Sequence, residues 1–284
     1  MTGTLPLLLA LASSAAAQAR PTEVAAVSPA GFDGSDNPAV EADAVVLQPV
    51  SDAFLIGRTA TAADAAARRA IASIVRQRFD DMSAYYHDVW RPQLPAEVRA
   101  RLPSTLTVVS RFRSFGKQAA IAREALAKEP LFAAASTDEQ VEQAILNVLS
   151  TISAPGFSRH AWGADIDAVS ATRSHWEGRG RFVALIPFFA TEAPRFGFYH
   201  PYSERRLSDT LPHHKDEPWH LSYWPIASAM EAAYMERISG EVLDDLIARA
   251  AKAIHGRVDE TRMRKLLAAT SLSSFRSNVA PPPE

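Results

Sequence analysis

The sequence predicts an α+β fold, with a small, mostly antiparallel sheet flanked by helices and with extra helices towards both ends of the chain. Helical and strand-like stretches are mixed, without the regular strand–helix–strand alternation that builds a parallel sheet. The strand-like stretches are short, and amphipathic segments of helical period lie before and after them. The 284 residues are enough for one large domain or two small ones.

The first 19 residues resemble a secretory signal peptide. An apolar stretch follows the first four residues and ends in Ala17-Gln18-Ala19, an A-x-A cleavage pattern before Arg20. This predicts a secreted or periplasmic protein, although no Lys or Arg precedes the apolar stretch, and an Ala-rich disordered or helical N-terminus is the alternative. The stretch is shorter than the roughly 20 residues of a membrane helix. No later segment qualifies either, so we expect no membrane span after signal cleavage.

The next segment, 20–58, has scattered Pro, Gly, Asp and Ser without a period and is predicted to be a linker or a loosely ordered segment. The folded domain is expected over 59–270. It opens with an amphipathic helix in which Thr61 is the expected N-cap, with Asp64 at the capping-box position. Its apolar positions at helical spacing are Ile71, Ile74, Val75 and Phe79.

The middle of the chain alternates short apolar runs with helical patterns. Strands are predicted at 106–110, at the end of the segment 155–170 and at 181–189, and helices at 117–129 and 136–150, the second of them opened by Ser136 or Thr137. The stretch 191–216 has little periodicity. Helical patterns return at 225–254 and 259–269, and the tail, 271–284, is expected to be disordered.

Composition limits the classes of function. The net charge of −2 argues against a nucleic-acid-binding protein, which normally has a strongly basic face. The chain has no cysteine, which excludes the cysteine-rich structural zinc classes. Any zinc site must therefore be built from histidines and carboxylates.

Two short segments supply such a set of residues. The first is Ser158-Arg159-His160-Ala161-Trp162-Gly163-Ala164-Asp165-Ile166-Asp167, and the second is Glu217-Pro218-Trp219-His220-Leu221-Ser222-Tyr223. Hydrolysis at a catalytic zinc needs three protein ligands, an open position for water and a carboxylate that accepts the proton of the water. Pro218 argues against a helix interior, and in a regular strand the odd spacing would place Glu217 and His220 on opposite faces. If both residues serve one zinc site, the chain must bend or bulge near Pro218, and we infer this bend from the expected function.

These segments resemble the SxHxxGxAxD and ExWH signatures of the LAS-type metallopeptidases. That group includes the D-alanyl-D-alanine carboxypeptidases of the VanY kind, related dipeptidases and the zinc domain of hedgehog proteins. The resemblance implies that His160, Asp167 and His220 hold one zinc ion per chain and that Glu217 is the catalytic base. It also implies a small antiparallel sheet with flanking helices.

Further matches extend the resemblance to about 106–224. Ser158 and Gly163 fall on the Ser and Gly of the first signature, whereas Asp165 stands where the signature has Ala. The segment 110–118 resembles the S-x-[YF]-R-S-x-x-x-Q stretch of VanY-like enzymes. Substrate contacts are therefore expected at Arg113, Gln118 and Ser158, with Arg113 gripping a terminal carboxylate or the developing oxyanion.

The resemblance implies a carboxypeptidase acting on peptidoglycan stem peptides. Three zinc enzymes remain alternatives, an L,D-carboxypeptidase, a dipeptidase and an endopeptidase, as does a cell-wall-binding module that keeps zinc only for structure. An intact Glu217 counts against the binding module, because a structural zinc site needs no base.

Overall fold

The computed structural model describes residues 50–202, 215–256 and 258–277, so the predicted signal peptide and most of the predicted linker lie outside the described residues. Its centre is a four-stranded antiparallel sheet, which confirms the predicted α+β class. The strands, in spatial order, are β1 (Val108–Ser110), β2 (Asp165–Ala168), β4 (His220–Tyr223) and β3 (Phe198–Tyr199).

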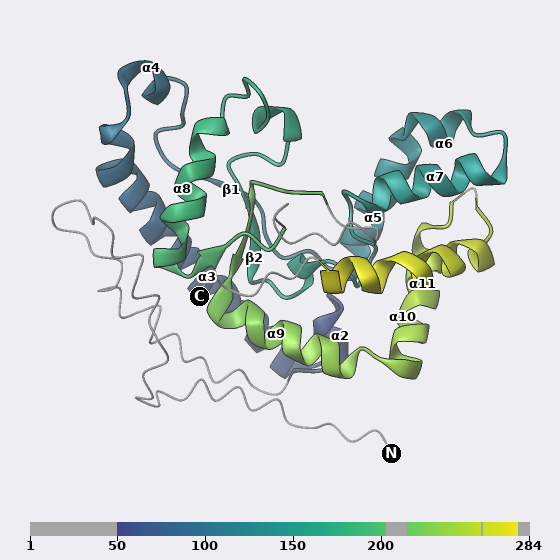
Figure 1. Ribbon diagram of the computed structural model, residues 1–284. Coiled ribbons are helices and arrows are strands. Elements are labelled where there is room, and N and C mark those ends of the chain that lie inside the picture. The colour runs from purple at the N-terminus through teal and green to yellow at the C-terminus, as the bar shows by residue number, and fades with distance from the viewer. Residues whose placement is uncertain (1–49, 203–214, 257, 278–284) are drawn as a thin grey trace.

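Helices surround this sheet. They are α2 (Asp52–Leu55), α3 (Ala62–Tyr85), α4 (Ala96–Arg99), α5 (Phe115–Lys128), α6 (Pro130–Ala134), α7 (Asp138–Leu149), α8 (Ile186–Thr191), α9 (Trp224–Arg237), α10 (Gly240–Ile254) and α11 (Glu260–Ser277). Short irregular helices are η2 (Tyr86–Trp90), η3 (Arg91–Gln93), η4 (Arg159–Ala161), η5 (Arg173–His175), η6 (Val183–Leu185) and η7 (Ala193–Phe196). Figure 1 shows α4 and α8 on one side of the sheet and α5, α6 and α7 on the other. Within the described residues, no helix is both long and apolar enough to cross a membrane.

The start of α3 has the predicted capping box. The Thr61 side chain accepts a hydrogen bond from the Asp64 amide, and the Asp64 carboxylate accepts one from the Thr61 amide in return. The same buried carboxylate accepts from the Ala60 amide and from both the amide and the hydroxyl of Ser51, at 2.8–2.9 Å. Burial alone would raise the pKa of Asp64, but these hydrogen bonds lower it below its usual value of 3.8.

We expect Asp64→Ala to lower the free energy of unfolding by at least about 2 kcal/mol at pH 7, because hydrogen bonds to a charged group contribute about 1.5–3 kcal/mol each. A carboxyl whose folded-state pKa is lowered adds stability above its unfolded-state pKa, and this stability is lost as the pH falls through the lower, folded-state value. The difference in urea unfolding between wild type and variant should therefore shrink below about pH 4. Asp80→Ala, at an exposed position of the same helix, is the control.

The segment 50–58 is part of the folded domain, so the predicted domain boundary at 59 is too late. Phe54 and Leu55 of α2 are fully buried in the core. Gly57 adopts a φ of +82°, and a Cβ there would lie 2.9 Å from the Phe115 nitrogen and 3.1 Å from the Arg113 carbonyl oxygen. The Gly57 carbonyl accepts the Phe115 amide at 2.9 Å. This segment therefore packs directly against the loop that carries Arg113.

Three other predictions need correction. Residues 181–189 form η6 and α8, not a strand, because an unbroken apolar run does not distinguish a buried strand from a buried helix, and Pro187 fits the first turn of a helix. The helical region 225–254 divides into α9 and α10 at Ser239, which is extended, and Gly240, whose φ is +51°. Helix α11 continues to Ser277, into the tail that was expected to be disordered.

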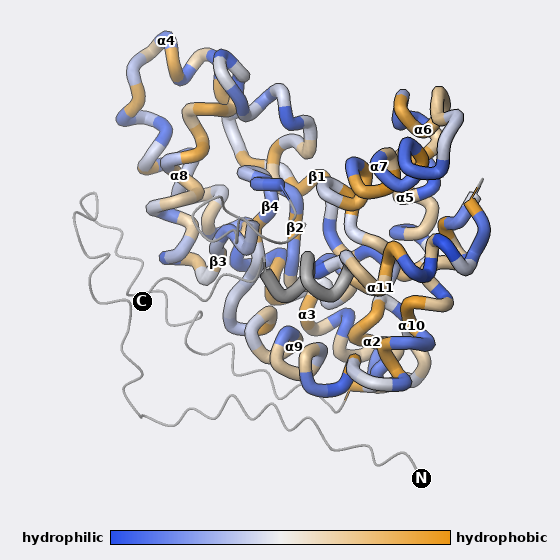
Figure 2. Tube along the Cα trace, turned by 45° about the vertical axis from the view of Figure 1, so that its right-hand side comes forward, coloured by the Kyte–Doolittle hydropathy of each residue, from blue (hydrophilic) through white to orange (hydrophobic). Residues whose placement is uncertain are grey.

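The central strands carry polar side chains into the interior. All four residues of β2 and all four of β4 are buried, including Asp165, Asp167, His220 and Ser222. Figure 2 shows β2 and β4 at the centre of the fold, between the helices, with blue, hydrophilic stretches along them. Buried charges are costly unless they pair or bind a metal, so this part of the sheet is a candidate site.

Candidate metal centre

His160 lies on η4, and one of its two ring nitrogens forms a hydrogen bond with the backbone. Its Nδ1 donates to the Arg111 carbonyl oxygen at 2.9 Å, which leaves Nε2 as the nitrogen with a lone pair. Burial lowers the pKa of His160 and so favours the neutral ring. The backbone holds the same loop in place, since the Arg113 amide donates to the His160 carbonyl oxygen at 3.1 Å.

Asp167 lies on β2 directly opposite His220 of β4. Its Oδ1 is 3.3 Å from His160 Nε2 and 3.4 Å from His220 Nδ1, while its Oδ2 forms an ion pair with Arg113. Burial raises the pKa of Asp167, but the two histidines lower it by more, well below 3.8. Asp167 is thus a buried carboxylate shared between two imidazoles.

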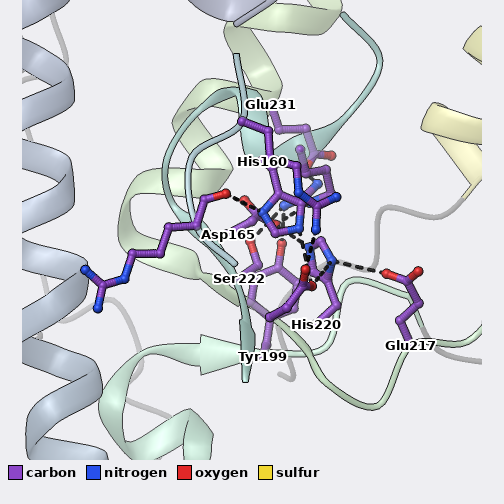
Figure 3. A network of polar contacts seen from close by, with 11 residues as sticks. His160, Asp165, Tyr199, Glu217, His220, Ser222 and Glu231 are labelled. Atoms are coloured by element: carbon purple, nitrogen blue, oxygen red, sulfur yellow. Dashed lines mark hydrogen bonds and ion pairs between the residues drawn. The ribbon is translucent and has the colours of Figure 1, made fainter. Parts of the chain in front are cut away.

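A turn in the chain brings the Glu217 side chain next to His220. The His220 amide donates to the Glu217 carbonyl oxygen at 2.9 Å, closing a turn through Pro218 and Trp219, so the predicted bend is confirmed. Glu217 Oε2 then lies 3.2 Å from His220 Nδ1, as the dashed line in Figure 3 shows. Burial lowers the pKa of His220, yet the neighbouring carboxylates of Asp165, Asp167 and Glu217 raise it well above 6.5. The surrounding carboxylates therefore favour positive charge at this point.

The donor atoms fit a metal cation. One ligand atom from each of His160, Asp167 and His220 lies within 4.8 Å of the others. Within the described residues, His160 Nε2 and Asp167 Oδ1 are buried and have no hydrogen-bond partner. Two acceptors that face each other at 3.3 Å repel unless a cation lies between them. Two imidazoles and one carboxylate, with no cysteine, are a ligand set typical of catalytic zinc.

The exposure of the four side chains separates their roles. The side chains of the three candidate ligands, His160, Asp167 and His220, are 2–3% exposed, whereas that of Glu217 is 11% exposed. Glu217 therefore borders the solvent beside a buried cluster, which is where a base that meets water and substrate must lie.

The three predicted substrate contacts lie in different surroundings. Arg113 reaches the cluster, where it pairs with Asp167 and donates from Nε to Ser110 Oγ at 2.9 Å. Gln118 is buried, and its amide donates to the Ser153 carbonyl oxygen at 2.6 Å. Ser158 is also buried, before η4. No hydrogen bond or ion pair joins Gln118 or Ser158 to the cluster in the part of the chain that the structure describes.

Two groups beside His220 were not predicted from the sequence. Tyr202 packs its ring edge-on against the His220 ring, with centroids 4.8 Å apart, and it comes from the aperiodic stretch 191–216, which gave no signal for it. Arg159 is buried and binds Asp165 through Nε at 3.0 Å. Arg159 stood inside the first signature, next to the acidic departure at Asp165, and this complementary charge was the signal that could have revealed it.

The part of the chain that carries the candidate metal centre matches a known protein family. Residues 96–226 match a family described as VanY: D-alanyl-D-alanine carboxypeptidase. An uncharacterized protein of Haemophilus influenzae is 29% identical over 92 residues, which cover 28% of this chain and 68% of that relative. Two solved structures are each 20% identical, with a TM-score of 0.38, over 57% of this chain and 76% of the other: VanYB in complex with D-Alanine-D-Alanine, and the vancomycin resistance D,D-pentapeptidase VanY in complex with Zn(II). The family match confirms the resemblance that the two signatures predicted.

Proposed function

We propose that this chain, which is a VanY-like zinc peptidase over residues 96–226, removes the terminal D-alanine from peptidoglycan stem peptides. The observation that carries the proposal is the position of Glu217 Oε2, 3.2 Å from His220 Nδ1, at the edge of a three-ligand cluster. A site that held zinc only for structure would need four protein ligands and no base. The predicted signal peptide fits a substrate found outside the cytoplasm.

Glu217 is the proposed general base. Its carboxylate takes a proton from the attacking water as the water oxygen bonds to the scissile carbonyl carbon. The same carboxylate then gives this proton to the leaving amine nitrogen as the C–N bond breaks. The turn at Pro218 fixes the carboxylate beside His220, so little reorganisation is needed before the proton moves.

His160, Asp167 and His220 are the proposed zinc ligands. A bound zinc ion supplies Lewis acidity for the attacking water and for the scissile carbonyl. Arg113 holds Asp167 through Oδ2 and leaves Oδ1 for the metal side of the cluster. The Arg113 side chain is still 19% exposed, so its guanidinium also borders the site from which substrate must enter.

The test of this function is product analysis on defined stem peptides. The zinc-loaded protein should release a single D-alanine from a pentapeptide that ends in D-alanyl-D-alanine, and mass spectrometry of the peptide shows the loss. Release of a dipeptide, cleavage inside a cross-linked dimer, or cleavage after an L-centre would identify a different peptidase of the same zinc class. Zinc binding without hydrolysis of any muropeptide would contradict an enzymatic role.

A C-terminally amidated pentapeptide tests whether Arg113 grips the free carboxylate. A guanidinium can meet a carboxylate with two parallel hydrogen bonds, which Lys cannot reproduce. We expect Arg113→Lys to raise KM by about 10–100-fold with little change in kcat, since hydrogen bonds to charged groups contribute about 1.5–3 kcal/mol. Amidation should then impair the wild type far more than the variant.

The same variant separates the other roles of Arg113. A lower kcat at unchanged KM would show that Arg113 stabilises the oxyanion that develops in the transition state. Weaker zinc binding would show that Arg113 holds the Asp167 carboxylate in the position that the metal requires. Equal sensitivity of wild type and variant to amidation would exclude the carboxylate contact, and with it the main reason to prefer a carboxypeptidase over an endopeptidase.

A further inference from the structure

A second carboxylate contacts His220 on the side away from the metal cluster. Asp165 precedes Asp167 by two residues on β2, so both side chains leave the strand on the same face. Its Oδ1 lies 3.1 Å from His220 Nε2, whereas the opposite ring nitrogen, Nδ1, faces Asp167 and Glu217. The His220 ring is therefore held between Asp165 on one edge and the proposed metal position on the other.

This contact decides which nitrogen of His220 is available. A neutral imidazole has one N–H and one lone pair, and the nitrogen that donates to a carboxylate is the one that keeps the proton. Donation from Nε2 to Asp165 leaves the lone pair on Nδ1, the nitrogen that faces Asp167. His160 is fixed in the opposite sense, by donation from Nδ1 to a backbone carbonyl.

Arg159 holds Asp165 in place. Both side chains are at most 1% exposed, and Arg159 Nε donates to the same Asp165 Oδ1 at 3.0 Å. The rest of the guanidinium also forms hydrogen bonds, from Nη1 to Glu231 at 3.2 Å and from Nη2 to Tyr199 and Ser222 at 2.8 and 3.0 Å. Figure 3 shows Asp165, Tyr199, Ser222 and Glu231 in one network with His220.

We propose that Asp165, anchored by Arg159, is a positioning residue that holds the His220 ring with its Nδ1 lone pair towards the metal and so strengthens zinc binding. The signature that this chain resembles has Ala at this position, so the pair is a feature of this chain that the signature does not assign. The inference rests on the proposed zinc site. Supporting partners of this kind typically change metal affinity by about 10–100-fold.

The experiment measures the zinc dissociation constant of metal-free protein by competition with a chelator of known affinity. Asp165→Ala should still bind one zinc per chain at saturation, but about 10–100-fold more weakly than the wild type. Asp167→Ala, which removes a proposed ligand, should lose tight binding. Glu231→Gln, which touches Arg159 but not His220, is the matched control and should keep the wild-type dissociation constant.

Because Asp165→Ala leaves Arg159 buried without its partner, the variant could also weaken zinc binding by disturbing the fold. The double variant Arg159→Met with Asp165→Ala removes both buried charges and fills the space with an unbranched apolar chain. If Asp165 positions His220, the double variant should bind zinc as weakly as Asp165→Ala, although its metal-free melting temperature recovers. Cobalt-loaded samples should keep the same visible bands, because the ligand set is unchanged.

Wild-type zinc affinity in either Asp165 variant, with the control also unchanged, would overturn the positioning role and leave the proposed function standing. Absence of zinc binding by the wild-type protein would instead overturn the proposed function, and this inference with it.

Discussion

Glu217→Gln is expected to keep one zinc per chain and to lose about 10²–10⁴-fold in kcat, which is the usual range for removal of a general base. The amide preserves the shape of the side chain at the turn but cannot accept the proton of the attacking water. None of the three proposed ligands is changed, so the zinc dissociation constant should stay close to the wild-type value. The measurement is kcat on the D-alanyl-D-alanine pentapeptide together with metal content.

Glu124→Gln is the matched control, because Glu124 is an exposed residue of α5 that forms an ion pair with Lys128, one helical turn away. It should leave both kcat and zinc content unchanged. A Glu217→Gln protein that turns over at near the wild-type rate would show that another group takes the proton. Loss of zinc in that variant would place Glu217 among the ligands.

His160→Ala and His220→Ala should each weaken zinc binding by more than about a hundredfold. Removing a ligand must cost more than removing a residue that supports one, for which about 10–100-fold is typical. Metal binding to such a site is coupled to its folding, so the melting temperature of both variants should no longer rise when zinc is added. Titration with a competing chelator and thermal melts with and without zinc provide the two measurements.

His87→Ala is the control for these variants, since the side chain of His87 is half exposed and pairs with Asp88 beyond the end of α3. It should bind zinc as the wild type does. Full metal occupancy in both ligand variants would contradict the proposed site, even if the protein proved to be a metal-dependent peptidase.

The sequence predicted the cluster through its resemblance to the two signatures of the LAS-type metallopeptidases. His160, Asp167 and His220 were identified from two short segments, and the strand pairing of β2 with β4 brings those segments together. The bend at Pro218 was inferred from the expected function, because Glu217 and His220 can face one zinc site only if the chain bends between them.

The sequence was less informative about features that depend on tertiary packing, namely the secondary structure of an apolar run and the partners of a buried arginine. The apolar run 181–189 contains Pro187 yet has no period that separates helix from strand, so its helical form depends on what covers it. The interaction of Arg159 with Asp165 spans only six residues, but its other partners, Tyr199, Ser222 and Glu231, come from β3, β4 and α9. Such a network exists only once the sheet and α9 have assembled.

The packing of residues 50–58 has a practical consequence for shortening this protein. A chain that starts at residue 59, where composition places the domain boundary, lacks Ser51, both buried side chains of α2 and the glycine that supports the Arg113 loop. It would expose core surface and deprive Asp64 of two hydrogen bonds while leaving every proposed zinc ligand in the sequence. A minimal active fragment should therefore begin before Val50, and low yield from a shorter one would reflect its lost packing rather than a defect in the metal site.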